Sequence, residues 1–200
     1  MAQPKDRLKD LPPIFHWRDL VDGGSTPGAA RVTVSRWVKQ ERVEPIGGMS
    51  GLYRNVTLEL NSPLWAEVFR RYLPNAIVAG RAALQHAGWL CGDADTVDLV
   101  VPLKMRPPQL DGVEYRHRTR AWLQQIALSD HQLYGFSVLA PEYALADLLV
   151  TDAAWVSTAQ LQIPEQISLS DIRDLAGALA PLYSRAQTHI VSPRRDGERM

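Results

Sequence analysis

The 200-residue sequence has a single cysteine, Cys91, and lacks any long apolar run. One cysteine excludes an intrachain disulfide, and we expect this lone thiol to be a small buried hydrophobic residue. No stretch approaches the ~20 apolar residues that span a bilayer, and the polar first residues do not resemble a secretory signal. With 22% charged and 46% hydrophobic residues, the composition predicts a soluble, cytoplasmic protein.

Signatures of catalysis are missing as well. The sequence contains neither a Gly-x-Ser-x-Gly nucleophile motif nor a phosphate-binding Gly-Lys-Ser/Thr motif. The histidines are scattered and none pairs at helical spacing with another ligand-type residue in a recognisable metal site: His16, His86, His117, His131 and His189. We therefore predict a protein that is not an enzyme, with no catalytic residue, no metal and no cofactor.

The formal net charge is zero, but the charges are unevenly spread along the chain. Residues 1–60 hold nine Lys/Arg against seven Asp/Glu, residues 61–120 hold eight against six, and residues 121–200 hold five against nine. The basic bias of the first two segments permits nucleic-acid binding without requiring it. The positions of the charged residues are therefore more informative about function than the net charge.

The first part of the chain predicts three short helices followed by a hairpin. The helices are expected over residues 6–11, 15–21 and from residue 26 to about 42, and the hairpin over 45–54. The third helix has the clearest start, because Thr26 offers a capping hydroxyl and proline follows at the first helical position. We assign residues 1–58 to a winged helix-turn-helix, with the hairpin as its wing.

The rest of the chain mixes helix and strand patterns. Helices are expected at 62–74, 76–88, 141–150 and from residue 168 to about 180, and strands at 97–102, 112–116 and 135–139. Residues 59–191 are accordingly predicted to be a larger α/β domain, and residues 192–200 a disordered tail. The fold class is α+β.

The third helix is the candidate DNA reader. Ala30, Val34, Trp37 and Val38 share one apolar face, which leaves a polar side of the kind that enters a major groove. Arginine there can pair with guanine, whereas serine, threonine and lysine mostly hold phosphates. The glycine-rich turn Gly47–Gly51 would let backbone amides approach the sugar-phosphate strand. The predicted DNA-binding residues are Thr26, Arg31, Thr33, Ser35, Arg36, Lys39 and Arg54.

Four motifs, in order, resemble the AbiEi-type antitoxins of type IV toxin–antitoxin systems, also described as predicted transcriptional regulators of viral defence systems. Residues 34–38 (VSRWV) and 51–53 (GLY) resemble the end of the family's DNA-reading helix and its wing. Residues 76–88, 98–102 and 140–149 resemble a later helix, a strand and a further helix. One departure is at residues 40–42 (QER), where the family has a glycine, so the geometry of that turn stays open.

The resemblance implies an autoregulating repressor that binds inverted repeats in its operator, as a homodimer or cooperatively. It also implies phage defence against a cognate nucleotidyltransferase-like toxin, antagonised without a stable complex.

The sequence is also compatible with two alternative functions. One is a winged-helix interaction module that binds protein or RNA. The other is a nucleotidyltransferase-like enzyme, suggested by residues 80–84 before a strand that contains Asp98, although Val100 stands where the second metal-binding carboxylate would be needed.

A second basic segment has two interpretations. In an extended strand Arg116, Arg118 and Arg120 would alternate onto one face, where they could hold phosphates, or they could form an ordinary solvated face. Asp147 is a candidate buried partner for one of these arginines. The candidate surface consists of Lys104, Arg106, Arg116, Arg118 and Arg120.

Overall fold

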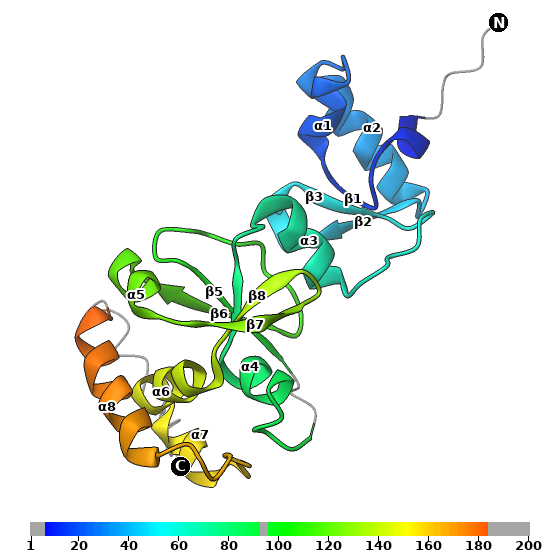
Figure 1. Cartoon of the computed structure of the whole chain (residues 1–200). Coiled ribbons are helices and arrows are strands. Elements are labelled where there is room, and N and C mark those ends of the chain that lie inside the picture. Colours follow the sequence, from blue (N-terminus) through cyan, green and yellow to red (C-terminus); the bar gives the residue numbers. More distant parts are fainter. Residues whose placement is uncertain (1–6, 93–95, 184–200) are drawn as a thin grey trace, which may run out of the picture. The chain divides into compact units, whose positions relative to one another are not determined.

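The computed structural model describes residues 7–92 and 96–183, so the predicted tail at 192–200 lies outside the described residues. The chain forms two compact units, which are described separately. The first contains the described residues up to Pro74 together with Arg106–Asp111, and the second contains those of Asn75–Met105 and those from Gly112 onward. The fold is a mixed α+β arrangement with two sheets (Figure 1).

The first unit combines short helices with one small antiparallel sheet in the order β1-β3-β2. Its elements are a 3-10 turn Arg7–Asp10, β1 Ile14–His16, α1 Trp17–Asp22, α2 Pro27–Lys39, β2 Val43–Ile46, a 3-10 turn Gly48–Ser50, β3 Leu52–Asn55 and α3 Leu64–Tyr72. The predicted boundary near residue 58 differs from the division after Pro74. The reason is that α3 contacts β1, and its Arg71 forms an ion pair of 2.8 Å with Asp19.

The predicted helix over residues 15–21 is wrong in its start. Phe15 pairs with Tyr53 across β1 and β3, and the helix begins only at Trp17. Strand pairing over three residues cannot be inferred from helical spacing of apolar residues, because both patterns place Phe15 in the core.

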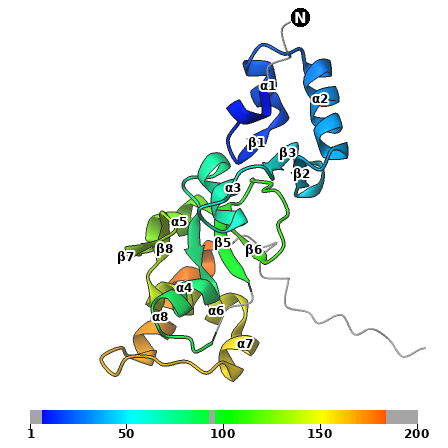
Figure 2. The same cartoon turned by 90° about the vertical axis from the view of Figure 1, so that its right-hand side faces the viewer.

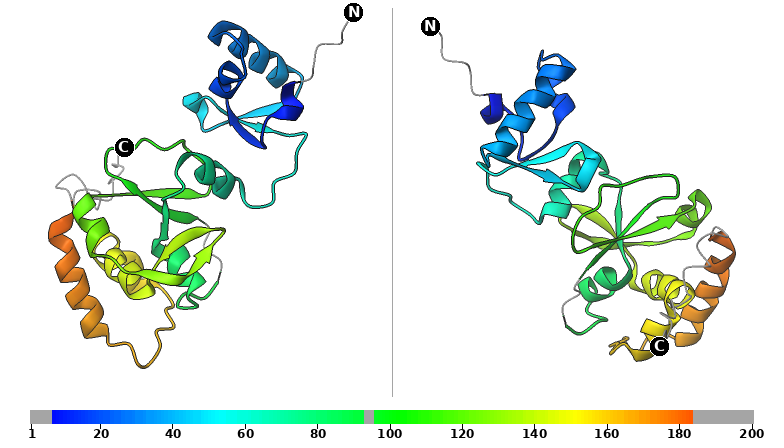
Figure 3. Two further views of the ribbon diagram at one scale, coloured as in Figure 1. Left: turned by 45° about the horizontal axis from the view of Figure 1, so that its top comes forward. Right: turned by 180° about the vertical axis from the view of Figure 1, so that it is seen from behind.

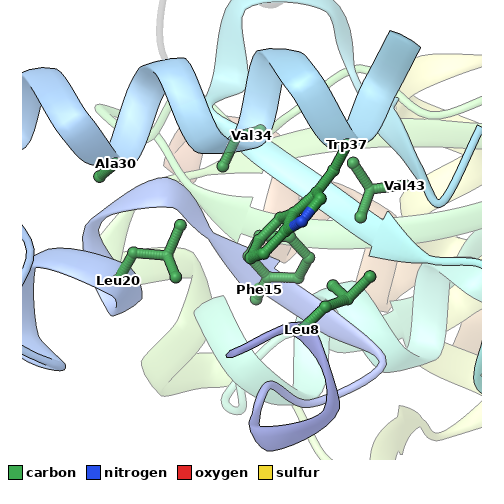
Figure 4. Packing of buried hydrophobic residues seen from close by; sticks show 7 residues of the cluster. All are labelled: Leu8, Phe15, Leu20, Ala30, Val34, Trp37 and Val43. Carbon is green, nitrogen blue, oxygen red and sulfur yellow. The ribbon is translucent and has the colours of Figure 1, made fainter. Parts of the chain in front are cut away.

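The core of the first unit lies beneath α2. Phe15 is fully buried, with its ring edge-on to Trp37 at 6.4 Å and stacked on Tyr53 at 5.8 Å. Figure 4 shows the seven side chains of this cluster directed toward one another: Leu8, Phe15, Leu20, Ala30, Val34, Trp37 and Val43. The predicted apolar face of the third helix is therefore confirmed, with Val38 at its partly buried margin.

The second unit is a five-stranded mixed sheet with strand order β6-β5-β4-β8-β7. Its strands are β4 Ile77–Ala79, β5 Val97–Pro102, β6 Val113–Arg118, β7 Leu128–Leu133 and β8 Phe136–Leu139. Its helices are α4 Gly80–His86, α5 Arg120–Gln125, α6 Pro141–Thr151, α7 Ala153–Thr158 and α8 Leu169–Leu179. Helix α6 contacts both α4 and α8 and lies between them in Figures 1 and 3. Figure 2 shows the same three helices gathered in one part of the second unit.

Two local interpretations in the second unit are corrected. The predicted helix at 76–88 is a strand followed by a helix, because β4 lies at the centre of the sheet between β5 and β8. Helices α5 and α7 and strand β7 were not predicted; β7 is largely exposed, so it lacks the apolar alternation of a half-buried strand.

The turn after α2 has the geometry of a glycine turn although it contains none. The Glu41 amide donates to the Val38 carbonyl and the Arg42 amide to the Trp37 carbonyl, each at 3.0 Å. These two bonds form a Schellman motif, which requires a left-handed residue after the C-cap. Glu41 has a φ of 55°, so it adopts the conformation that glycine favours.

We expect Glu41→Gly to raise the free energy of unfolding by about 1 kcal/mol, since a side chain in the left-handed region costs about 1–2 kcal/mol. The control is Ser35→Gly, exposed in the middle of the same helix, which should lower it by about 0.5 kcal/mol. Urea denaturation of the full chain measures both. Destabilisation by both variants would contradict the strained-turn interpretation.

Candidate nucleic-acid interface

Helix α2 begins as its sequence predicts. The Thr26 hydroxyl accepts a hydrogen bond from the Ala29 amide at 3.3 Å, and Pro27 occupies the first helical position. This bond uses one lone pair of the hydroxyl and leaves its proton free to donate to a ligand oxygen. Gly28 and Ala29 follow, and both are exposed. The first turn of the helix is thus capped by its own Thr26 and remains accessible to a partner.

The outward side of α2 is basic. Arg31, Arg36 and Lys39 are exposed, and residues 23–40 contain no aspartate or glutamate. Within the described part of the chain, Arg36 and Lys39 form no ion pair with a carboxylate. A cluster of cations without internal counter-ions creates a positive potential that favours an anionic partner.

One arginine of this face is held in place by aromatic stacking. The Arg31 guanidinium lies 4.6 Å from the centroid of the Trp17 ring, which is also approached by Arg18 at 5.5 Å. Stacking on tryptophan restricts the long side chain and leaves the edge donors of its guanidinium available. Arg31 is therefore preorganised, whereas Arg36 and Lys39 form no comparable stacking or ion-pair contact among the described residues.

The hairpin packs against the Trp17 ring of this stack. Gly51 has a φ of 78°, and a Cβ there would lie 2.6 Å from His16 Nε2 and 3.0 Å from Trp17 Cδ1. The Trp17 amide also donates to the Gly51 carbonyl at 3.2 Å. The glycine in the predicted wing thus has a definite function, which is to let the Trp17 ring lie against the hairpin.

His16 caps α1 next to this contact. Its Nδ1 accepts from the Arg18 amide at 3.1 Å, and its own amide donates to Asp19 Oδ2 at 2.9 Å. Burial and the charge of Arg18 lower the pKa of His16 below its usual value. The imidazole is accordingly neutral at pH 7, the state in which Nδ1 can accept the capping bond. The His16 ring lies tilted against the Trp17 ring, with the two centroids 5.4 Å apart.

The hairpin tip differs from the prediction. A Cβ on Gly47 would lie 2.7 Å from the Gln109 carbonyl oxygen, so Gly47 and Gly51 serve internal packing. Gly48 alone among the glycines 47–51 is exposed. Arg54 lies opposite Glu44 in the β2–β3 register and is 3.7 Å from its carboxylate. It lines a cavity of about 340 Å³ whose lining residues include none from α2.

The structure brings together most, not all, of the predicted DNA-binding residues. Arg31, Ser35, Arg36 and Lys39 surround one shallow hollow on α2. Thr26 is exposed at the helix start, but Thr33 is half-buried because it lies one turn before Trp37. The same hollow contains Val32, which is 71% exposed. The sequence pattern did not single out this valine, because it belongs neither to the apolar face of the helix nor to its polar residues.

The predicted second basic surface does not form as a continuous row. Arg116 and Arg118 do share a face of β6, but both point into the second unit and form ion pairs of 2.7 Å with Asp98 and Asp147. Arg120 lies on α5 instead of on the strand. Lys104 and Arg106 are exposed and belong to different units.

Asp147 is the buried charge partner that the sequence left undecided. Its carboxylate accepts from Arg118 Nε at 3.0 Å and Nη2 at 2.7 Å, and also from the Tyr183 hydroxyl. Trp122 Nε1 donates to the same hydroxyl at 3.2 Å. Burial and the Asp147 charge raise the pKa of Tyr183, so the phenol stays a donor. This network connects β6, α6 and the end of the described chain.

Asp98 is the carboxylate on which the nucleotidyltransferase alternative rested. It is fully buried, accepts from the Arg81 amide at 2.8 Å and pairs with Arg116. Burial opposes the charged form of Arg116, but Asp98 and Asp147 together raise its pKa. A Cβ on Gly80 would overlap the Asp98 carboxylate. The Asp98 carboxylate therefore fills the space at the N-terminus of α4.

Two further predictions concern reactive groups. Cys91 is exposed, which contradicts its prediction as a buried residue; it follows the end of α4 in a loop and does not lie in the sheet core. No group of three or more His, Cys, Asp or Glu able to hold a metal ion occurs among residues 7–92 and 96–183.

Over the same residues, no helix has both the length and the apolar character needed to cross a membrane.

Comparison with known proteins bears on the fold. No protein-family model and no curated protein matches the chain. Among solved structures, the crystal structure of the RV2827C protein from Mycobacterium tuberculosis is similar, with a TM-score of 0.51 and 16% identity. The likeness covers 74% of this chain and 59% of that chain, so it spans about three fifths of the neighbour's length. It supports the α+β fold and carries no statement about function.

We expect Asp147→Ala to lower the free energy of unfolding by about 3–5 kcal/mol, because it leaves Arg118 charged and unpaired in the interior. The matched control is Asp130→Ala, an exposed carboxylate on β7, which should change stability by less than about 0.5 kcal/mol. Urea denaturation followed by tryptophan fluorescence compares them. Equal midpoints for the two variants would show that the pair is not needed for stability.

Proposed function

We propose that the first unit is a winged helix-turn-helix that binds double-stranded DNA, with α2 as its recognition helix. The observation that carries this proposal is the outward side of α2, where three exposed cations surround a hollow and residues 23–40 contain no carboxylate. The opposite side is fixed in the core by Val34 and Trp37. The basic side is thus held outward by the packing of the helix itself.

The dimensions of α2 suit a major groove. A helix of 13 residues is about 20 Å long and about 10–12 Å across, and the groove of B-DNA is about 12 Å wide. The exposed Gly28 and Ala29 at its start add little bulk. An A-form RNA duplex has a major groove too deep and narrow for side chains to read, which favours DNA over duplex RNA as the partner.

The side chains divide into two roles. Arg36 is free to turn toward a base edge, where its donors match the two acceptors of guanine. Arg31, stacked on Trp17, is positioned for a contact of fixed geometry. Thr26, Ser35 and Lys39 are placed to hold phosphates. Thr33, being half-buried, and Arg54, which is engaged by Glu44, are expected to contribute less.

The proposed β2–β3 wing acts mainly through the stack that it supports. Gly51 allows Trp17 to lie against the hairpin, and Trp17 in turn holds Arg31. Among the three glycines of the wing, the exposed Gly48 offers a backbone position for close approach to a sugar-phosphate strand. We accordingly assign the wing a supporting role instead of the direct grip on phosphate that its glycines suggest.

The biological function proposed with this interface is transcriptional repression of the chain's own operon, at inverted repeats bound by a homodimer or cooperatively. The resemblance to AbiEi-type antitoxins extends this to antagonism of a nucleotidyltransferase-like toxin in phage defence. The two alternatives carry less support. A module that binds protein or RNA does not require a carboxylate-free basic helix face. Nucleotidyl transfer would require Asp98 to leave Arg116 and the amide of Arg81.

We expect the chain to shift a duplex containing the region upstream of its own gene, with an affinity that falls steeply as salt rises. Arg36→Ala should weaken binding by about 1–3 kcal/mol if it contacts a base. Lys39→Ala should weaken binding to all sequences and reduce the salt slope by about one. Gel shifts over a range of salt concentrations measure these changes.

The matched control for both variants is Arg173→Ala, an exposed arginine on α8 in the second unit. It removes the same charge from the chain and should leave affinity and salt slope unchanged. Unaltered binding by Arg36→Ala and Lys39→Ala together would refute α2 as the interface. Equal loss in the Arg173→Ala control would indicate non-specific attraction to the whole chain.

The antitoxin function has a separate test in cells. A nucleotidyltransferase-like toxin encoded beside this chain should arrest growth when expressed alone, and co-expression of the chain should restore growth. The double variant Arg36→Ala, Lys39→Ala should still restore growth if the larger unit carries the antitoxin activity. Growth arrest that persists when the wild-type chain is co-expressed would contradict the antitoxin function and leave the regulatory function untouched.

A further inference from the structure

Val32 is the most exposed large hydrophobic residue on the described surface of the chain, at 71%. It is two residues from Ala30 and two from Val34, a spacing that turns it to the side of α2 opposite the core. It therefore lies at the middle of the proposed DNA-facing side. A single exposed valine would need no explanation elsewhere on a surface, but here its surroundings are specific.

The surroundings of Val32 are cationic and open. Gly28, Val32 and Arg36 form one row along the helix at a spacing of four, and Arg31, Ser35 and Lys39 form the neighbouring row. The side chains at 31, 32, 35, 36 and 39 line one shallow hollow. The isopropyl group thus forms an apolar spot within a frame of three positive charges, with a residue lacking a side chain one turn before it.

Local helix formation does not favour this residue. Valine is β-branched, so its side chain loses rotamer freedom in a helix, and alanine or lysine would be more favourable at an exposed position. It contributes nothing to the core cluster beneath α2. Neither helix propensity nor burial therefore accounts for a valine at this position, whereas contact with an apolar group of a partner would.

The edge of a base pair in the major groove carries one apolar group, the 5-methyl of thymine. We propose that Val32 contacts this methyl group, so that the site bound by α2 contains thymine opposite the hollow, with phosphates near the flanking cations. This inference rests on the proposed function and deepens it. Val32 is then a specificity-determining residue, whereas Lys39 contributes affinity for any sequence.

The probe is a duplex selected from a random library by the wild-type full-length chain. Each thymine of the selected duplex is replaced in turn by deoxyuridine, which removes only the 5-methyl group and keeps the hydrogen-bonding edge. The affinity of the wild-type chain should fall about fourfold at the contacted thymine, the factor that corresponds to burying one methyl group. Replacement at the other thymines should leave it unchanged.

The variant that tests the assignment is Val32→Ala. It should bind the thymine duplex several-fold more weakly and show no further loss on the deoxyuridine duplex, since the two changes remove the two sides of one contact. The matched control is Leu169→Ala, an exposed apolar residue on α8. This control should keep both the wild-type affinity and the wild-type loss on deoxyuridine.

Two results would overturn the inference while leaving DNA binding intact. In the first, the wild-type chain binds every deoxyuridine duplex as tightly as the thymine duplex. In the second, Val32→Ala retains the full wild-type loss, so that another residue contacts the methyl group. If the wild-type chain enriches no duplex from the library, the proposed DNA-binding function itself fails, and this outcome is distinct from the other two.

Discussion

The contact between Phe15 and Trp37 determines which side of α2 faces outward. Phe15 comes from a strand of the small sheet and Trp37 from the last turn of the helix, and both are almost completely buried. With Ala30 and Val34 on the same face, rotation of α2 about its axis would expose this cluster and bury three cations without partners. The direction of the basic side is thus a consequence of core packing, and any function of that side depends on it.

A second chain of contacts passes from the hairpin to the helix surface. Gly51 leaves room for His16 and Trp17, the neutral imidazole of His16 caps α1, and the Trp17 ring holds the Arg31 guanidinium. The hairpin therefore influences the interface mainly through packing. A glycine that suggests close approach to a ligand can equally be required for close packing within the protein.

The second unit places its charges inward. Arg116 and Arg118 alternate onto one face of β6, as the strand pattern predicted, but that face lies against the helices, where Asp98 and Asp147 are fully buried. Ion pairs of this kind contribute orientation and connect elements that lie far apart in the sequence, since Arg118 and Asp147 belong to β6 and α6. They leave the outward side of α2 as the basic surface on which the functional proposal rests.

The sequence alone determined what depends on neighbouring residues. The start of α2 at Thr26 and Pro27, its buried face, the strand at Val97–Pro102 and the helix from Pro141 follow from capping and periodicity. Only the tertiary structure decided whether Phe15 and residues 77–79 form strands, and which charges lie at the surface. Strand pairing and ion pairing join residues distant in the chain, so no local pattern contains them. For the same reason a spacing of two could align three arginines but could not reveal that two of them face Asp98 and Asp147 in the interior.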